Sequence, residues 1–173
     1  MKKIYKPTSD YAFFHEPYLD LVPDDGDLLQ HLRDIQTETA DLIAGLTEEQ
    51  LNYSYDEGKW TIKDILVHLS DCERIFIYRA TRCARGDKTD LPGFDEALFA
   101  GNANANKREI NDIMKELEAF RVASIVFIDT LDEDALSRTG TANGYPISTR
   151  LIANHIYGHH RHHLNIIKQQ YLQ

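Results

Sequence analysis

The feature that most constrains this chain is a long apolar stripe with helical spacing between residues 62 and 83. Apolar side chains recur there every three or four positions, which puts them on one face of a helix. The stripe consists of Ile62, Ile65, Leu69, Cys72, Phe76, Ala80 and Cys83. A helix with one apolar face has to bury that face against other elements. The pattern therefore predicts a long amphipathic helix inside a packed domain.

Three further stretches show the same periodicity and predict helices over about 28–46, 107–131 and 148–171. Capping patterns support the boundaries: Thr47 and Gln50 form a capping-box pair, Thr61 and Asp64 form another, and Ser148 suits an N-cap. Residues 1–24 have no clean period and predict an irregular arm. Residues 94–106 predict a long crossover, and residues 139–146 predict a loop. We expect an all-α four-helix bundle without strands.

Length and composition agree with a single domain spanning residues 1–173. No apolar run is long enough to span a membrane, and no signal peptide follows the first lysines. The net charge of −9 opposes a phosphate-binding surface, so nucleic acid is not an expected partner. Cys72 and Cys83 are too far apart on one helix to pair. Two reduced, buried thiols indicate a cytoplasmic protein.

Histidines are concentrated near the end of the chain, with five of the eight within nine residues. At about 100° per residue, His159 and His163 fall within roughly 20° of the centre of the apolar face. His160 and His162 fall on the flanks, and His155 is intermediate. Two packed core histidines are one interpretation. The other is a metal site, because two imidazoles one helical turn apart each carry a ring nitrogen suited to an ion.

A metal ion needs a third ligand from elsewhere, and His68 is the best candidate. It lies at the edge of the stripe on the 62–83 helix, where a boundary histidine with one nitrogen in water is the alternative. His15 and His31 are weaker candidates. Neither cysteine is expected to reach the histidine pair easily. Carboxylates that could orient an imidazole through its other nitrogen are Asp64, Asp71 and Glu73. Three histidines would leave an open coordination position, as catalytic zinc sites do.

Arg79 lies roughly 60° from the centre of its helix stripe, closer to the buried face than arginines usually lie. Two roles fit this position. The side chain either extends to solvent along the apolar surface, or it binds an anionic group of a substrate.

Four segments together resemble the DinB/YfiT-like family of small bacterial four-helix metalloproteins. They are Leu46–Leu51, Trp60–Arg74, Leu91–Asp95 and Gly158–Leu164. The resemblance covers nearly the whole chain. It implies a divalent ion, most often zinc or nickel, held by His68, His159 and His163. Many relatives carry glutamate where this chain has His160, so no acid–base role is carried over and the catalytic residues are unknown.

Members of the family include thiol S-transferases that use bacillithiol or mycothiol, a maleylpyruvate isomerase and proteins considered hydrolases. The resemblance therefore implies a metal-dependent hydrolase or a low-molecular-weight-thiol S-transferase with a small-molecule substrate. The alternative is a non-catalytic metal-binding or ligand-sensing stress protein, which would use the same residues. Family members also tend to form homodimers. The aromatic arm (Tyr11, Phe13, Phe14) would cover either a dimer face or its own core.

Overall fold

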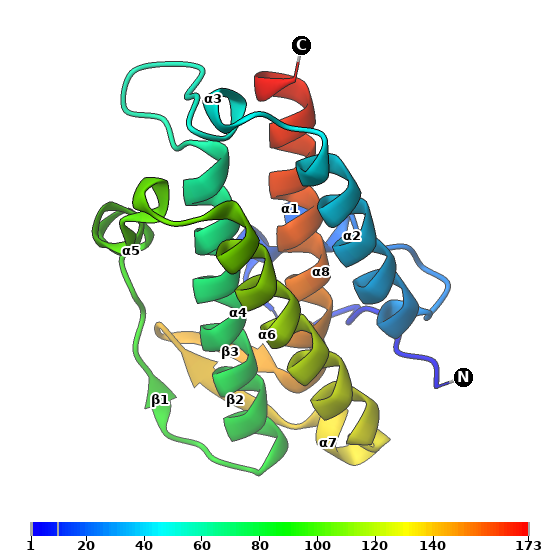
Figure 1. Ribbon diagram of the computed structural model, residues 1–173. Helices are drawn as coiled ribbons and strands as arrows, with labels where there is room; N and C mark the ends of the chain where they lie inside the picture. The colour runs from blue at the N-terminus through cyan, green and yellow to red at the C-terminus, as the bar shows by residue number, and fades with distance from the viewer. Residues whose placement is uncertain (1, 10, 173) are drawn as a thin grey trace.

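Four long helices form the body of the protein in the computed structural model, which describes residues 2–9 and 11–172. These helices are α2 (Leu28–Ala44), α4 (Ile62–Ala84), α6 (Ile110–Thr130) and α8 (Thr149–Ile166). Helix α4 packs against α6 and α8, and α2 packs against the same two helices (Figure 1). The predicted all-α four-helix bundle is confirmed. None of the described helices is long and apolar enough to cross a membrane.

The long connection between α4 and α6 gives the bundle its topology. The chain leaves α4 at one end and returns along its flank through β1 (Asp90–Leu91), α5 (Glu96–Ala103) and the 3-10 turn η2 (Ala105–Lys107). Helices α4 and α6 therefore run in the same direction, while α2 and α8 run the opposite way (Figure 1). The expected crossover is present, and its helical character is concentrated in α5.

The expectation of a strand-free chain is wrong. Strand β2 (Thr139–Ala142) pairs antiparallel with β3 (Tyr145–Ser148), and β1 adds to β2 in parallel. The turn between β2 and β3 is Asn143-Gly144, and both residues have positive φ. That is the backbone of a type I′ hairpin turn, which Asn-Gly favours. The predicted loop at 139–146 is thus a hairpin that leads directly into α8.

Side chains at the helix ends explain where the helices begin. Thr61 accepts from the backbone N–H of Asp64, whose carboxylate accepts from the N–H of Thr61. The same reciprocal pair joins Thr47 and Gln50 at α3 (Glu48–Leu51). Ser148 caps α8. Helix α6 begins later than the predicted range of about 107–131, because Asn104 ends α5 in a left-handed conformation and Glu109 is the N-cap of α6.

The N-terminal arm is more ordered than its sequence indicates. It contains the 3-10 turn η1 (Phe13–His15) and the short helix α1 (Glu16–Leu19), and α1 packs against α8. Ile4 and Leu19 are buried in the core, whereas the Phe13 side chain is 78% exposed. Two further short elements complete the described chain. Helix α7 (Glu133–Ser137) precedes the hairpin, and the π-helical turn η3 (Ile167–Tyr171) continues α8.

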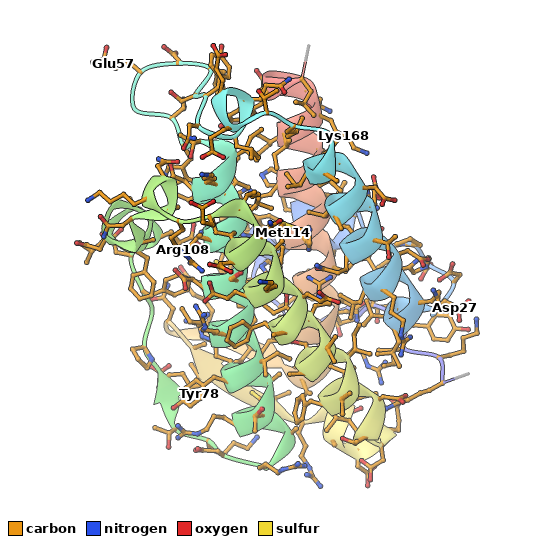
Figure 2. The ribbon with its side chains drawn as sticks, in the orientation of Figure 1. Asp27, Glu57, Tyr78, Arg108, Met114 and Lys168 are labelled. Carbon is orange, nitrogen blue, oxygen red and sulfur yellow. The ribbon has the colours of Figure 1, made fainter. Side chains whose placement is uncertain are left out.

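The hydrophobic core consists of two clusters, one toward the hairpin end and one toward the α3 end. Figure 2 shows side chains filling the space between α6 and its neighbours, with Met114 on the α6 side. Between the two clusters lies a layer of buried polar side chains. Its members are Thr39, Glu73, Arg121 and His160, one from each long helix. The histidines of the candidate site lie beside this layer.

Candidate metal centre

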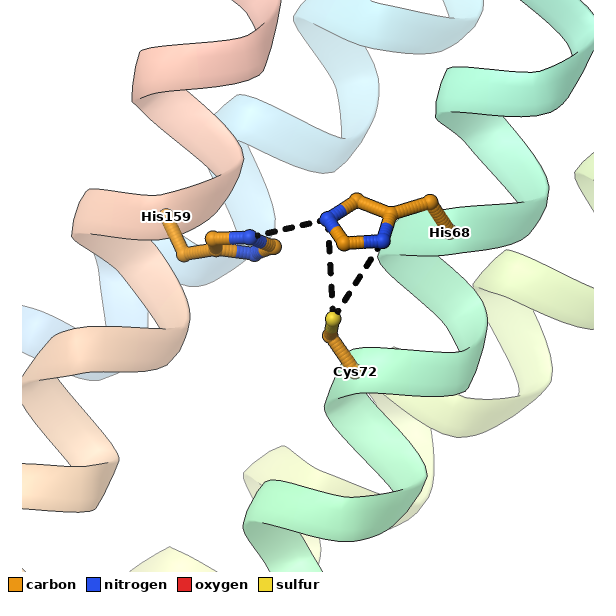
Figure 3. Close-up of side chains that lie close together, drawn as sticks. All are labelled: His68, Cys72 and His159. Carbon is orange, nitrogen blue, oxygen red and sulfur yellow. Dashed lines mark hydrogen bonds between the residues drawn. The ribbon is translucent and has the colours of Figure 1, made fainter. Parts of the chain in front are cut away.

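Helices α4 and α8 lie side by side, and each presents two potential ligands one turn apart. His68 and Cys72 come from α4, and His159 and His163 come from α8. Residues at i and i+4 share a helix face, so each pair points to the same side. Figure 3 shows that His68 and Cys72 face His159 across the interface between the two helices. The site is therefore built from two helices that are distant in the sequence. We refer to His68, Cys72, His159 and His163 together as the cluster.

The Nε2 atoms of the three histidines are very close. Nε2 of His159 lies 3.1 Å from Nε2 of His68 and 3.2 Å from Nε2 of His163. Cys72 Sγ lies 3.6 Å from both ring nitrogens of His68. The ligand atoms of His68, Cys72 and His159 all lie within 4.8 Å of one another. His163 is not part of that group and contacts it through Nε2 of His159.

Hydrogen bonding alone does not explain these contacts. A neutral imidazole nitrogen carries either one hydrogen or one lone pair, so it makes one strong hydrogen bond. Nε2 of His159 has two ring nitrogens at hydrogen-bond distance and can satisfy only one of them. Lone pairs from the three Nε2 atoms directed at one cation would satisfy all three of these atoms. Ligands about 2.05 Å from a tetrahedral ion lie about 3.3 Å apart, close to the observed separations. The residues present therefore fit a metal ion.

Burial keeps these rings neutral, which is the form that binds metal. Burial lowers the pKa of His68 to about 4. It lowers the pKa of His163 to about 3, with further contributions from His68 and His162. The pKa of His159 lies well below its usual value, mainly through burial and then through the two neighbouring rings. Burial also raises the pKa of the Cys72 thiol.

Aromatic side chains enclose the cluster. Trp60 lies against His68, with ring centroids 4.7 Å apart, and stacks on His163 at 6.4 Å. Phe76 and Tyr18 contact the His159 ring on its other sides, at 5.6 and 5.7 Å. This apolar surrounding limits the access of water to the ring nitrogens and strengthens their interaction with a charge.

A cavity of about 270 Å³ opens beside His159. Its wall includes Arg79, Glu96, Tyr18 and His155. Arg79 donates to the carbonyl of Pro92 at 2.8 Å and lies over the Phe94 ring. No carboxylate forms an ion pair with Arg79 among the described side chains. Its guanidinium is half-buried, and burial lowers its pKa. The cavity thus places a cation that has no carboxylate partner among the described side chains in the same wall as His159.

His155 and His15 form a second histidine pair on the cavity wall, with their Nδ1 atoms 3.2 Å apart. Burial lowers the pKa of His155 to about 3 and that of His15 to about 4. Neither ring belongs to the group of His68, Cys72 and His159. His15, a weak ligand candidate from the sequence, therefore faces the cavity rather than the cluster.

His160 is buried in the polar layer and does not lie on the flank of the core. Its Nδ1 accepts from Arg121 at 2.9 Å, and its Nε2 lies 2.9 Å from the hydroxyl of Thr39. Thr39 donates to the carbonyl of Ile35, so Nε2 of His160 carries the hydrogen. Arg121 also forms a two-pronged ion pair with Glu73. These four side chains are at most 3% exposed. His160 thus links α8 to α2 and α6.

The carboxylates considered as orienting partners have other roles. Asp64 caps α4, Asp71 pairs with Arg74, and Glu73 pairs with Arg121. His31 pairs with Asp25 at the surface, 2.9 Å away. The expectation that neither cysteine reaches the histidines is wrong for Cys72. Helix α4 is covered by α6 on one side and α8 on the other, so its buried arc is wide enough to include both His68 and Cys72.

Comparison with known proteins agrees with this architecture. A relative from Geobacillus thermodenitrificans named "Putative metal-dependent hydrolase" is 27% identical over 107 residues, 62% of this chain and 60% of the relative. A similarly named protein from Oceanobacillus iheyensis is 26% identical over 82% of this chain and 84% of its own. The solved structure of YfiT from Bacillus subtilis is described as a probable metal-dependent hydrolase with an unusual four-helix bundle topology. It superposes with a TM-score of 0.74 at 16% identity, over 96% of this chain and 91% of YfiT. The sequence matches the DinB superfamily over residues 31–167, and the chain belongs to that family.

Proposed function

We propose that this protein is a metal-dependent enzyme acting on a small molecule, either a hydrolase or a low-molecular-weight-thiol S-transferase. His68, His159 and His163 would hold the divalent ion, which we expect to be zinc or nickel. The observation that carries the proposal is the pair of 3.1 and 3.2 Å contacts made by one nitrogen of His159. The names of the relatives support the hydrolase class.

The chemistry of such a site follows from its donors. An ion held by neutral imidazoles lowers the pKa of bound water, binds a thiolate or polarises a carbonyl. The chain itself contributes the enclosure, because Trp60, Tyr18 and Phe76 surround the ring nitrogens. His155 and His15 line the cavity beside His159 and offer nitrogens for proton transfer there.

Arg79 would bind an anionic group of the substrate. Its guanidinium faces the cavity without a carboxylate partner among the side chains described, and a half-buried cation is stabilised by a paired anion. Once a model substrate is turned over, Arg79→Gln should raise the KM for anionic compounds and leave the KM for neutral analogues nearly unchanged. Equal effects on both classes would exclude this role.

The metal-binding part is tested on untagged protein by elemental analysis after gel filtration. Wild-type protein should carry about one divalent ion per chain, and His159→Ala should carry none while remaining folded. His31→Ala is the control, since His31 pairs with Asp25 at the surface, away from these histidines. Full metal content in His159→Ala would refute the proposal.

A second candidate function is a non-catalytic metal-binding or ligand-sensing protein. The proximity of Cys72 to His68 favours it, because a fourth protein ligand closes a site to substrate. A panel of activated esters, amides and electrophilic thiol acceptors separates the two. Turnover that depends on the metal and disappears in His159→Ala supports the enzyme, and stoichiometric metal without turnover supports the sensor.

The proposal also covers the cellular compartment and the oligomeric state. The two free, buried cysteines fit a reducing cytoplasm. A homodimer remains our expectation for the assembly in solution, and light scattering at several concentrations tests it.

A further inference from the structure

The cluster contains one side chain that the three-histidine site does not use. Cys72 is completely buried, and its Sγ lies 3.6 Å from His68 Nε2, the atom that lies 3.1 Å from His159 Nε2. Cys83, the other free cysteine, lies eleven positions further along α4 and packs against Gly140 of the hairpin. Only Cys72 is therefore placed to interact with the histidines.

The separation of Cys72 from His68 suits shared coordination of an ion. Zinc–nitrogen and zinc–sulfur bonds of about 2.05 and 2.3 Å at tetrahedral angles place the two donors about 3.6 Å apart. That is the observed distance between Cys72 Sγ and His68 Nε2. The spacing repeats on the partner helix, where His159 and His163 are also four residues apart. Two facing i, i+4 pairs offer four donors, the number that completes a tetrahedral site. Three of them, His68, Cys72 and His159, already have their ligand atoms within 4.8 Å of one another, and His163 adjoins His159 at 3.2 Å.

A second observation indicates that the cluster is incomplete without a ligand. Nε2 of His159 lies 3.1 Å from Nε2 of His68 and 3.2 Å from Nε2 of His163, and one ring nitrogen cannot form a hydrogen bond with both. Nδ1 of His163 also has no hydrogen-bond partner among the described residues, and an ion held at Nε2 would not change that. The hydrogen-bonding capacity of this group of rings is therefore not satisfied by the protein alone.

We propose that Cys72 is the fourth protein ligand of the ion, and that the resting centre is a closed site with three nitrogens and one sulfur. This inference rests on the proposed metal binding by the three histidines. When the ion binds, the S–H bond of Cys72 breaks, its proton goes to solvent and the sulfur electron pair bonds to the ion. No electron is transferred. A substrate or other exogenous ligand would reach the ion from the cavity beside His159 by displacing this sulfur, which takes up a proton from the incoming ligand or from solvent and becomes a thiol again.

Cobalt(II) substitution tests the sulfur bond directly, without reference to activity. Cobalt-loaded wild-type protein should show a thiolate-to-cobalt charge-transfer band in the near ultraviolet. Cys72→Ser should lose the band, and the matched control Cys83→Ser should keep it. X-ray absorption of the zinc form should show one sulfur neighbour at about 2.3 Å in wild type and none in Cys72→Ser.

The outcomes separate this inference from the proposed function. Stoichiometric cobalt without the band in wild type would overturn the role of Cys72 and leave the three-histidine site intact. It would indicate that the thiol bonds to Nδ1 of His68, which is also 3.6 Å away, and only orients the ring. Absence of stoichiometric metal in wild type would instead refute the proposed function.

Azide, as a small exogenous ligand, tests the closure. Azide should perturb the visible spectrum of cobalt-loaded Cys72→Ala at a lower concentration than that of cobalt-loaded wild type. In wild type azide has to displace the sulfur, so its binding should also weaken the thiolate-to-cobalt band. The same concentration dependence in both proteins would contradict the closed resting site. Cys72→Ala also serves as a second variant if serine at this buried position impairs folding.

Discussion

Nε2 of His68 and Nε2 of His159 lie 3.1 Å apart although the two residues are 91 positions apart in the sequence. The contact exists because α4 and α8 pack side by side, with the long crossover and the hairpin between them in the chain (Figure 1). An ion bound at this point would bridge the two helices. Metal binding and bundle stability are therefore coupled.

Added zinc should stabilise the protein, and His68→Ala should abolish that effect. A ligand that binds only the folded chain adds about 2.7 kcal/mol to the free energy of unfolding at 100 times its Kd. For a chain of this size each kcal/mol raises Tm by about 2–4 °C. Thermal unfolding of chelator-treated protein, with and without zinc, measures the shift. His31→Ala is the control, because His31 pairs with Asp25 away from the cluster. A zinc-induced shift that survives in His68→Ala would argue against the site.

Metal-free protein should lose stability as the pH falls below about 6.5. Burial lowers the folded-state pKa of His68 to about 4 and that of His155 to about 3, whereas unfolded histidine titrates near 6.5. Between pH 6.5 and about 4 the unfolded chain binds more protons than the folded chain, so the free energy of unfolding decreases with falling pH. The stability that depends on neutral histidine rings is fully present above pH 6.5. Urea titrations across the window measure it, and a flat profile would show that these rings are not held neutral.

The sequence predicted the bundle because its four apolar stripes are long and regular. The reciprocal Thr61–Asp64 and Thr47–Gln50 caps then located the starts of α4 and α3. The hairpin was missed although Asn143-Gly144 is a strong turn signal, because its strands have only four residues each and follow a long helical region. Short strands carry little periodicity, and their pairing depends on the sheet that they join.

The candidate site was only partly predictable, for a physical reason. A helical wheel of α8 places His159 and His163 together, since both belong to one helix. The wheel of α4 places His68 near the edge of its stripe, and it does not show that His68 is as fully covered as Cys72. His68 is buried because both α6 and α8 pack against α4. The apolar pattern of α4 alone does not show that a second helix covers it. The same applies to Arg121, whose partner Glu73 is 48 positions away.

Breaking the buried ion pair should be costly. Arg121 and Glu73 are 2% and 3% exposed, and Arg121 also donates to His160 and to the carbonyl of Leu32. Glu73→Gln leaves the guanidinium without its charge partner, so the free energy of unfolding should fall by about 3–5 kcal/mol. Asp112→Asn is the control. Its ion pair with Lys115 is exposed, and the expected change is below about 1 kcal/mol. Urea unfolding measures both changes. Similar losses of unfolding free energy in the two variants would show that burial does not make the Arg121–Glu73 pair more important than an exposed pair.

Gly158 permits the close approach of α1 to α8. A Cβ atom at this position would lie 2.1 Å from the backbone oxygen of Tyr18, so alanine requires α1 to move. Gly158→Ala should lower the free energy of unfolding by about 1–3 kcal/mol, as overpacking does. The matched control is Gly101→Ala on α5, where nothing lies within 4 Å and alanine should stabilise by up to about 1 kcal/mol. Because the proposed ligands come from α4 and α8, Gly158→Ala should retain its metal, whereas the displaced Tyr18 should alter ligand binding in the cavity. Unchanged stability with unchanged cavity binding would show that α1 accommodates the methyl group without moving Tyr18.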